Sequence, residues 1–215
     1  RRPPPRGGGA APRAGGPPPP YTSPLPQKPL FQNPMWAGLD LAASECRPSA
    51  VALGDTWETL QVFTVYEDSS ILAQLRLAQV VWVDAPLTLG KGAFRDCDRQ
   101  LHSVGIAPLP LTWPSMQALH RRALALFKQG PHAEWRETFP WSLYRYLGAM
   151  VGRKKDPKLL AHWARRMGFT KTLNTIHEWD ALACWSIGWL SLQDLAVCIS
   201  GEEGAIWIPK SQRNS

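Results

Sequence analysis

The order of hydrophobic and polar residues predicts alternating strands and helices from residue 36 onward. Short runs that are continuously apolar or rich in β-branched and aromatic residues predict strands, and apolar residues repeated every three or four positions predict helices. The predicted strands cover residues 36–42, 49–53, 58–66, 80–83, 135–139 and 205–208. The predicted helices cover residues 69–78, 115–129, 142–151, 157–167 and 175–192.

This order of elements indicates an α/β fold. Three consecutive strands are followed by a helix, a strand, a helix, a strand and further helices. That is the order of the ribonuclease H fold, in which an antiparallel meander of three strands is extended by parallel strands and the mixed sheet is flanked by helices. The polar stretch 85–114, which contains several Gly and Pro, is too long for a plain connection, and we expect it to be a functional loop.

Residues 1–34 differ sharply in composition from the rest of the chain. They contain 12 of the 21 prolines and 5 of the 17 glycines, and five basic residues but no acid. Such a segment cannot bury enough apolar surface to offset the entropy lost on ordering, so we expect a disordered leader. Because the first apolar run begins directly at Met35, we also expect that the natural chain starts there, and that residues 35–215 form one domain.

The net charge of +7 suggests at first a nucleic-acid binder. With the five bases of the leader set aside, however, the rest of the chain carries 19 basic residues against 17 acids. A nearly neutral body gives little support to the binding of a polyanion by charge alone, because neutralising phosphates needs several clustered bases. The basic composition is therefore weak evidence for a nucleic-acid partner.

The apolar runs and the cysteines indicate a cytoplasmic protein. The longest apolar run, 181–192, is too short to cross a bilayer, and the leader lacks the apolar segment of a secretory signal. The four cysteines show no C-x-x-C spacing, which gives no support to a zinc site or a redox pair. We therefore expect reduced thiols in the cytoplasm and no membrane partner.

Acidic residues stand at costly positions in the predicted strands. Asp40 interrupts an apolar strand, on the face that alternation gives to Trp36 and Gly38. Asp84 ends a buried strand, at the edge where open α/β sheets bind ligands. Glu137 is in phase with the aromatic residues of its own strand. A buried carboxylate costs several kcal/mol unless it is paired, hydrogen-bonded or bound to metal.

The last long helix adds Asp180 and His177, which lie three residues apart on one helix face. Thr175 and Glu178 fit a capping box at its start, which gives Glu178 a structural role, whereas capping does not explain Asp180.

Each of these residues also has an ordinary structural interpretation. Asp84 can cap a turn before proline, Asp180 can complement the positive end of its helix, and Glu137 can pair with a nearby base such as Arg136. His177 alone is more often a structural histidine than a ligand. Asp40 is the hardest to explain in this way, because aspartate disfavours the middle of a strand.

Three or four converging carboxylates without cysteine form a hard oxygen site for Mg²⁺ or Mn²⁺. Such ions activate water and stabilise the leaving oxygen in phosphodiester hydrolysis. We therefore predict Asp40, Asp84 and Asp180 as metal ligands and catalytic residues, with Glu137 as a fourth catalytic carboxylate that acts as ligand or base.

The loop after the fourth strand carries candidates for binding the substrate. Arg95 and Arg99, on one face of a short helix, and Lys91 are predicted to contact phosphate, although a solvated charged helix start is the alternative. His177 and Asp98 are predicted to support the catalytic groups, and His177 can also carry protons.

The motifs resemble a known family, domain of unknown function 429, which is described as predicted nucleases of the ribonuclease H fold. The resemblance runs in order along nearly all of residues 35–209. Its motifs here are G-L-D-L-A at 38–42, D-A-P-L at 84–87, R-D-C-D-R at 95–99, E-T-F-P at 137–140, H-E-W-D-A-L at 177–182 and A-I-W-I-P at 205–209. Glu178 stands where the family often has Asp, which leaves open whether it caps or binds.

Three functions follow from these observations. The first is a metal-dependent nuclease that hydrolyses DNA or RNA with Mg²⁺ or Mn²⁺. The second is a non-catalytic domain of the same fold that keeps the carboxylates for structure or partner binding, which applies if Asp40, Asp84 and Asp180 lie too far apart to share a metal. The third is a nucleotide-binding module, because G-x-D-x-A-x-S at 38–44 is similar to the first phosphate loop of actin-like ATPases. The oligomeric state stays open.

Overall fold

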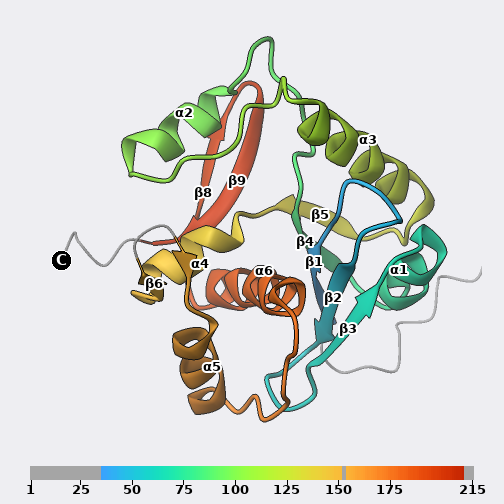
Figure 1. Ribbon diagram of the computed structural model, residues 1–215, viewed down its shortest axis with the longest axis vertical. Coiled ribbons are helices and arrows are strands. Elements are labelled where there is room, and N and C mark those ends of the chain that lie inside the picture. Colours follow the sequence, from blue (N-terminus) through green and yellow to red (C-terminus); the bar gives the residue numbers. More distant parts are fainter. Residues whose placement is uncertain (1–34, 152–153, 211–215) are drawn as a thin grey trace, which may run out of the picture. The chain divides into compact units, whose positions relative to one another are not determined.

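The structure of this chain is a computed structural model that describes residues 35–151 and 154–210. The disorder predicted for residues 1–34 lies outside these ranges. The described residues form an α/β unit around one five-stranded mixed sheet (Figure 1). Its strands are β1 (Trp36–Asp40), β2 (Ser49–Gly54), β3 (Gln61–Val65), β4 (Val80–Asp84) and β5 (Glu134–Glu137).

The sheet has the order β3-β2-β1-β4-β5. Strands β1, β2 and β3 form an antiparallel meander, and β4 and β5 extend it in parallel with β1. The prediction of a mixed α/β sheet, antiparallel at one side and parallel at the other, is therefore confirmed.

Helices cover both faces of the sheet (Figure 1). On one face, α1 (Asp68–Leu75) and α3 (Pro114–Gln129) bury the largest apolar core against the strands. On the other face lies α6 (Ile176–Leu192), with α4 (Pro140–Tyr146) and α5 (Pro157–Arg166) packed against it. Helix α6 is apolar nearly all round because it is buried by these neighbours. Within the described ranges, no helix is long and apolar enough to cross a membrane.

The alternation along β1 places its acid on the face of α6. Ala37 and Leu39 join the core under α1 and α3, so Gly38 and Asp40 point the opposite way. A side-chain carbon at Gly38 would collide with the Ala181 carbonyl oxygen and the Trp185 amide of α6. Glycine therefore lets the backbone of α6 lie directly on β1, next to Asp40.

The structure differs from the prediction after α4. A helix was expected over 142–151, but α4 ends at Tyr146 and Gly148 follows with a left-handed φ of +66°. The chain then forms a short hairpin of β6 (Met150–Val151) and β7 (Lys154–Lys155). The hairpin starts where glycine adopts a conformation that most residues avoid.

The last strand is longer than predicted and does not join the main sheet as a full strand. β9 (Gly204–Pro209) pairs antiparallel with β8 (Ala196–Gly201), a strand that the sequence interpretation missed. A single parallel bridge between Thr138 and Trp207 links this hairpin to the end of β5. The hairpin packs on α2 (Asp96–Ser103), the short helix within the stretch 85–114 on which the sequence placed Arg99.

Candidate functional site

Two aspartates stand side by side at the carboxyl ends of the parallel strands β1 and β4. Asp40 and Asp84 are direct partners in the register of these strands. The face of β4 that carries Trp82 looks towards α6, since a side-chain carbon at Gly188 of α6 would collide with the indole of Trp82. Asp84, two residues later, lies on the same face as Asp40.

Helix α6 brings two more of the predicted residues to this edge. His177 Nδ1 lies 2.7 Å from Asp40 Oδ2, and Asp180 is buried one turn further along the helix. The helix starts with the predicted capping box, in which Thr175 Oγ1 accepts from the Glu178 amide and Glu178 accepts from the Thr175 amide. Glu178 therefore caps the helix. It also accepts a hydrogen bond from the Thr64 hydroxyl at 2.8 Å.

Lys155 completes the cluster, and the sequence interpretation missed it as a site residue. Its ammonium lies 2.5 Å from Asp180 Oδ2 and 5.3 Å from the centre of the Tyr144 ring. In the sequence it belonged to a basic run at 153–155, which is a weak signal for surface contact with a polyanion. We use the name carboxylate cluster for Asp40, Asp84 and Asp180 together with their basic neighbours Lys155 and His177.

Burial and like charge dominate the electrostatics of the cluster. Burial, followed by the charges of Asp40 and Asp180, raises the pKa of Asp84 well above 3.8. Burial also raises the pKa of Asp180, and Lys155 opposes part of this shift. Each negative charge added here is therefore costly, and the site favours a positive partner.

The pKa values of the two basic groups are raised as well, but by their acidic partners and not by burial. The hydrogen bond to Asp40 raises the pKa of His177 above 6.5, against the effect of its partial burial. Burial lowers the pKa of Lys155, but the charge and hydrogen bond of Asp180, and then Asp84, outweigh it, so the net pKa is raised. Both groups therefore hold their protons more tightly beside the acids than in water.

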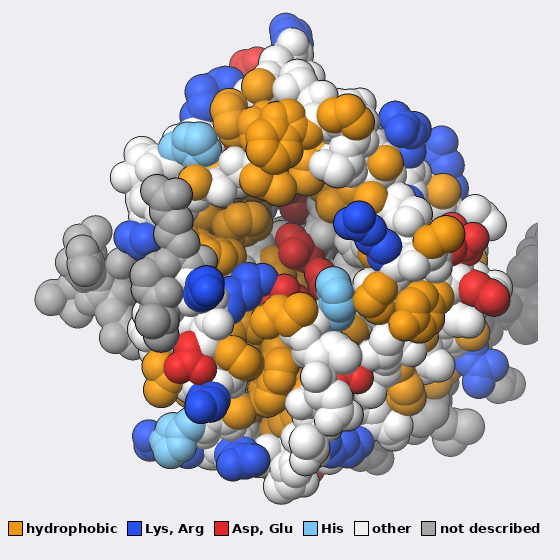
Figure 2. Space-filling view, in the orientation of Figure 1, with side chains coloured by type: hydrophobic (Ala, Val, Ile, Leu, Met, Phe, Trp, Pro, Cys, Tyr) orange, Lys and Arg blue, Asp and Glu red, His pale blue; other side chains and the backbone are white. Residues whose placement is uncertain are grey.

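Some oxygens of the cluster have no hydrogen bond of good geometry. Asp180 Oδ1 is buried without such a bond to any residue that the structure describes, although the nearby Tyr144 hydroxyl acts on this carboxylate and opposes part of the rise in its pKa. The Tyr144 hydroxyl, which the neighbouring carboxylate influences, is buried without a hydrogen bond of good geometry too. The buried carboxylate of Asp84 is influenced by the charge of Lys155, which opposes only part of the rise in its pKa. Figure 2 shows acidic side chains gathered in a hollow of this face, bordered by a histidine and by basic side chains.

The cluster is not arranged as a metal site in this conformation. Among the described residues, no group of three or more His, Cys, Asp or Glu side chains is placed to hold a metal ion. Two of the acidic oxygens point instead to groups of the chain itself, to the Lys155 ammonium and to the His177 ring. The cluster therefore combines three acids with two basic side chains, each of which contacts one acidic oxygen.

Glu137 lies on the opposite face of the sheet, which corrects its predicted place in the site. Its parallel partner in β4 is Val83, and Val83 belongs to the core under α1 and α3. Glu137 does share a face with Trp135, as predicted, but that face points away from Asp40 and Asp84. Both of its carboxylate oxygens bind Arg95, and one also accepts from the Leu87 amide.

Arg95 is a buried structural residue, and the prediction that it contacts phosphate is wrong for this arrangement. Its side chain is 1% exposed, and its donors bind Asp98, Glu137 and the hydroxyl and carbonyl of Thr88. A guanidinium group has five N–H donors, so none remains for a ligand. Asp98 supports this pairing and, with Arg95, caps α2, at a distance from the α6 face. We call Arg95, Asp98 and Glu137 the arginine network.

Lys91 and Arg99 lie at the turn between β8 and β9. The Lys91 amide donates to Glu203 Oε1, and Arg99 lies 3.7 Å from the same carboxylate. The Arg99 side chain is 61% exposed and donates to the Phe94 carbonyl. Both bases can reach a ligand from the surface, and their predicted contact with phosphate stays a prediction.

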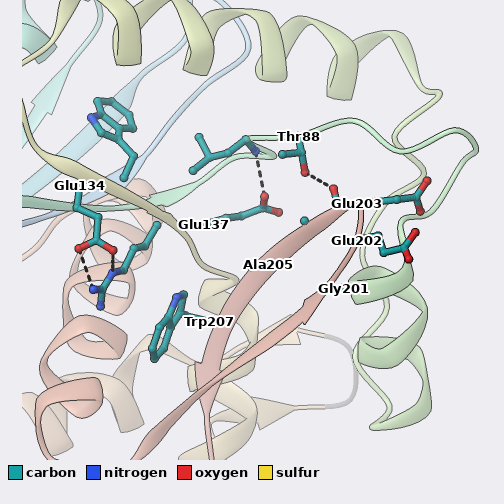
Figure 3. A pocket seen from close by; sticks show the side chains of 12 residues that line it. Thr88, Glu134, Glu137, Gly201, Glu202, Glu203, Ala205 and Trp207 are labelled. Atoms are coloured by element: carbon teal, nitrogen blue, oxygen red, sulfur yellow. Dashed lines mark hydrogen bonds and ion pairs between the residues drawn. The ribbon is translucent and has the colours of Figure 1, made fainter.

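A separate cavity of about 480 Å³ opens between β5 and the β8–β9 turn (Figure 3). At its wall, Arg136 lies over the rings of Trp82 and Trp207, at 4.9 and 5.1 Å, and forms a double hydrogen bond with Glu134. Of the site residues predicted from the sequence, only Glu137 lines this cavity, and Arg95 occupies both of its oxygens.

Comparisons of the chain with models of known protein families, with curated proteins and with solved structures found no match. The resemblance to domain of unknown function 429 therefore stays a prediction, and the argument for function rests on the geometry of the carboxylate cluster.

Proposed function

We propose that the protein is a metal-dependent nuclease of the ribonuclease H type, which hydrolyses phosphodiester bonds at the carboxylate cluster. The observation that carries the proposal is the placement of Asp40 and Asp84 side by side at the ends of parallel strands, facing Asp180 of α6. The meander followed by parallel strands supports the same fold type. Ligands of open α/β sheets bind at this edge.

The chemistry of the donors fits a hard divalent cation. Asp40, Asp84 and Asp180 would hold Mg²⁺ or Mn²⁺ through carboxylate oxygens, which are the ligands that these ions prefer. Asp180 Oδ1 is buried without a hydrogen bond of good geometry among the described residues, and the pKa of Asp84 is raised. Both observations indicate negative charge that a bound cation would stabilise. When bound, such an ion lowers the pKa of water and stabilises the charge of the leaving oxygen.

His177 positions Asp40 and holds a proton at the site. Its Nδ1 lies against Asp40, which leaves Nε2 as the second ring nitrogen, and the side chain is 39% exposed. Because the hydrogen bond to Asp40 raises the pKa of His177, the ring keeps its proton to a higher pH than a free histidine does. A protonated histidine at the mouth of the site can donate a proton to a departing alkoxide oxygen.

A second candidate is a non-catalytic domain in which the same acids have a structural role. It is favoured by the contacts of Lys155 and His177 with Asp180 and Asp40, and by the lack of an arranged metal group in the part of the chain that the structure describes. Under this function the cluster binds no divalent ion, and the two basic side chains neutralise it permanently.

Cleavage assays with the full chain separate these two functions. Fluorescent single- and double-stranded DNA and RNA are incubated with the protein in Mg²⁺, in Mn²⁺ or in EDTA. We expect cleavage only with a divalent ion and a loss of at least about 100-fold in Asp40→Asn and Asp84→Asn, since each removes a metal ligand. Asp194→Asn is the matched control, because the Asp194 side chain is 93% exposed and follows the C-terminal end of α6, whereas Asp180 lies near the start of this helix.

The proposal fails if the wild-type protein cleaves none of these substrates with either ion. It also fails if Asp40→Asn and Asp84→Asn, folded by circular dichroism, cleave as fast as Asp194→Asn. In either case the non-catalytic function is favoured.

A further inference from the structure

Lys155 reaches the carboxylate cluster from a short hairpin. The strands β6 and β7 have two residues each, and α5 starts directly after β7 with Asp156 as its cap. Two-stranded ladders this short are weak by themselves. The side chain of Lys155 is 24% exposed, whereas that of its partner Asp180 is 9% exposed. The ammonium therefore reaches the cluster from the more exposed side, on a two-residue strand that pairs with β6.

The ammonium occupies an oxygen that the proposed metal site needs. Lys155 Nζ lies 2.5 Å from Asp180 Oδ2, and the charges of Asp84 and Asp40 also act on it. A divalent cation that binds the three aspartates would be close to this positive charge, and two cations repel each other strongly at a partly buried site. Asp180 Oδ2 therefore cannot bind the Lys155 ammonium and a divalent cation equally well at the same time.

We propose that Lys155 is a tethered cation that neutralises the cluster without metal and is displaced from Asp180 when a divalent ion binds. The inference rests on the proposed function, because it assumes that the three aspartates bind the ion. Lys155 then acts as a built-in competitor. It protects the apo site against charge repulsion and lowers the apparent affinity for the ion, since only molecules with a displaced lysine can bind.

Two positions on the same strand provide a matched pair of variants. Lys154, the neighbour of Lys155 in β7, is exposed and makes no ion pair in the described ranges, so Lys154→Met removes the same charge without touching Asp180. Lys155→Met removes the competitor, and Lys155→Gln removes its charge but keeps a hydrogen-bond donor. The second variant is used if the first does not fold.

The first measurement is the binding of Mn²⁺ to the full-length, EDTA-stripped protein by isothermal titration calorimetry. We expect Lys155→Met and Lys155→Gln to bind Mn²⁺ about tenfold more tightly than the wild type, and Lys154→Met to bind like the wild type. If the Lys155 variants bind Mn²⁺ equally or more weakly, while the wild type does bind it, the inference is overturned and the proposed metal site stands. If Mn²⁺ binds to none of the proteins, both the inference and the proposed metal site are overturned.

The second measurement follows Lys155 directly. Reductive methylation of lysine amines, read by mass spectrometry, is carried out on the wild type in EDTA and in Mn²⁺. We expect the methylation rate of Lys155 to rise several-fold with Mn²⁺, because the ammonium leaves its buried partner, and that of Lys154 to stay constant. A Lys155 rate that Mn²⁺ does not change would show that the ion pair persists, and would overturn displacement.

Discussion

The carboxylate cluster and the arginine network contain the same kinds of groups and lie on opposite faces of one sheet. In the network, a single guanidinium that is 1% exposed binds two buried carboxylates and Thr88, and these contacts use all of its donors. In the cluster, three carboxylates share one lysine and one histidine, whose side chains are 24% and 39% exposed. Within the described part of the chain, Asp180 Oδ1 is still buried without a hydrogen bond of good geometry.

This difference separates structural acids from acids that are available for chemistry. Burial does not distinguish them, since Asp98 and Glu137 are as buried as Asp40 and Asp180. What differs is how completely their hydrogen-bonding capacity is used. A network in which every hydrogen-bonding group has a partner holds loops in place. A group of buried acids with incomplete hydrogen bonding at a strand end is instead stabilised when a positively charged ligand binds.

The largest expected effect follows from breaking the arginine network. Arg95→Met leaves Asp98 and Glu137 without their partner, so we expect a loss of about 3–5 kcal/mol in the free energy of unfolding. Arg99→Met, which changes an exposed arginine of the same helix, should cost less than about 0.5 kcal/mol. Urea denaturation of both variants measures the difference. Equal, small losses would contradict a structural role for the network.

In the carboxylate cluster we expect a smaller change in the free energy of unfolding, and an increase instead of a loss. Because burial and its acidic neighbours raise the pKa of Asp84 above 3.8, the folded protein binds a proton there more tightly than the unfolded chain. The charged group therefore destabilises the fold at pH values above its folded pKa, and this penalty disappears as the pH falls towards 3.8. We expect Asp84→Asn to raise the free energy of unfolding by about 1–2 kcal/mol at pH 7 and to change it little near pH 4.

Urea denaturation in EDTA at these two pH values measures this effect without interference from metal ions. Asp194→Asn serves again as the control and should show no such pH dependence. A loss of stability in Asp84→Asn at pH 7 would mean that its carboxylate is stabilised in the native state, against the comparison drawn above.

The elements of the fold that the sequence predicted are those that local sequence patterns specify. The meander, the capping box at Thr175 and the helices at 114–129 and 157–166 follow from short-range patterns, and the structure contains them. The hairpin after α4 and strand β8 were missed because each follows a residue in the left-handed backbone conformation. These residues are Gly148 and Asp194, with φ values of +66° and +56°. The hairpin of β8 and β9 also packs on α2, a contact between segments far apart in the sequence that no local pattern shows.

For the site, the sequence identified residues but not always the face on which they lie. Asp40, Asp84, Asp180 and His177 could be grouped because each follows from its own strand end or helix face. Glu137 could not be placed, because its phase along β5 shows which residues share a face, and only the register with Val83 shows which face that is. Lys155 needed the unforeseen hairpin.

The smallest expected effect is a difference in the local opening of the two regions, read from buried thiols. Burial raises the pKa of Cys97, beside Arg95, to about 11, and burial also raises that of Cys184 in α6, beneath the cluster. At pH 8 both should react with a disulfide reagent only through opening of the fold, whereas the exposed Cys46 reacts at once. Arg95→Met should speed the labelling of Cys97 more than that of Cys184, because the network anchors α2. Peptide mass spectrometry follows the labelling of each cysteine. If Arg95→Met speeds the labelling of Cys97 and Cys184 equally, Arg95 acts only through global stability.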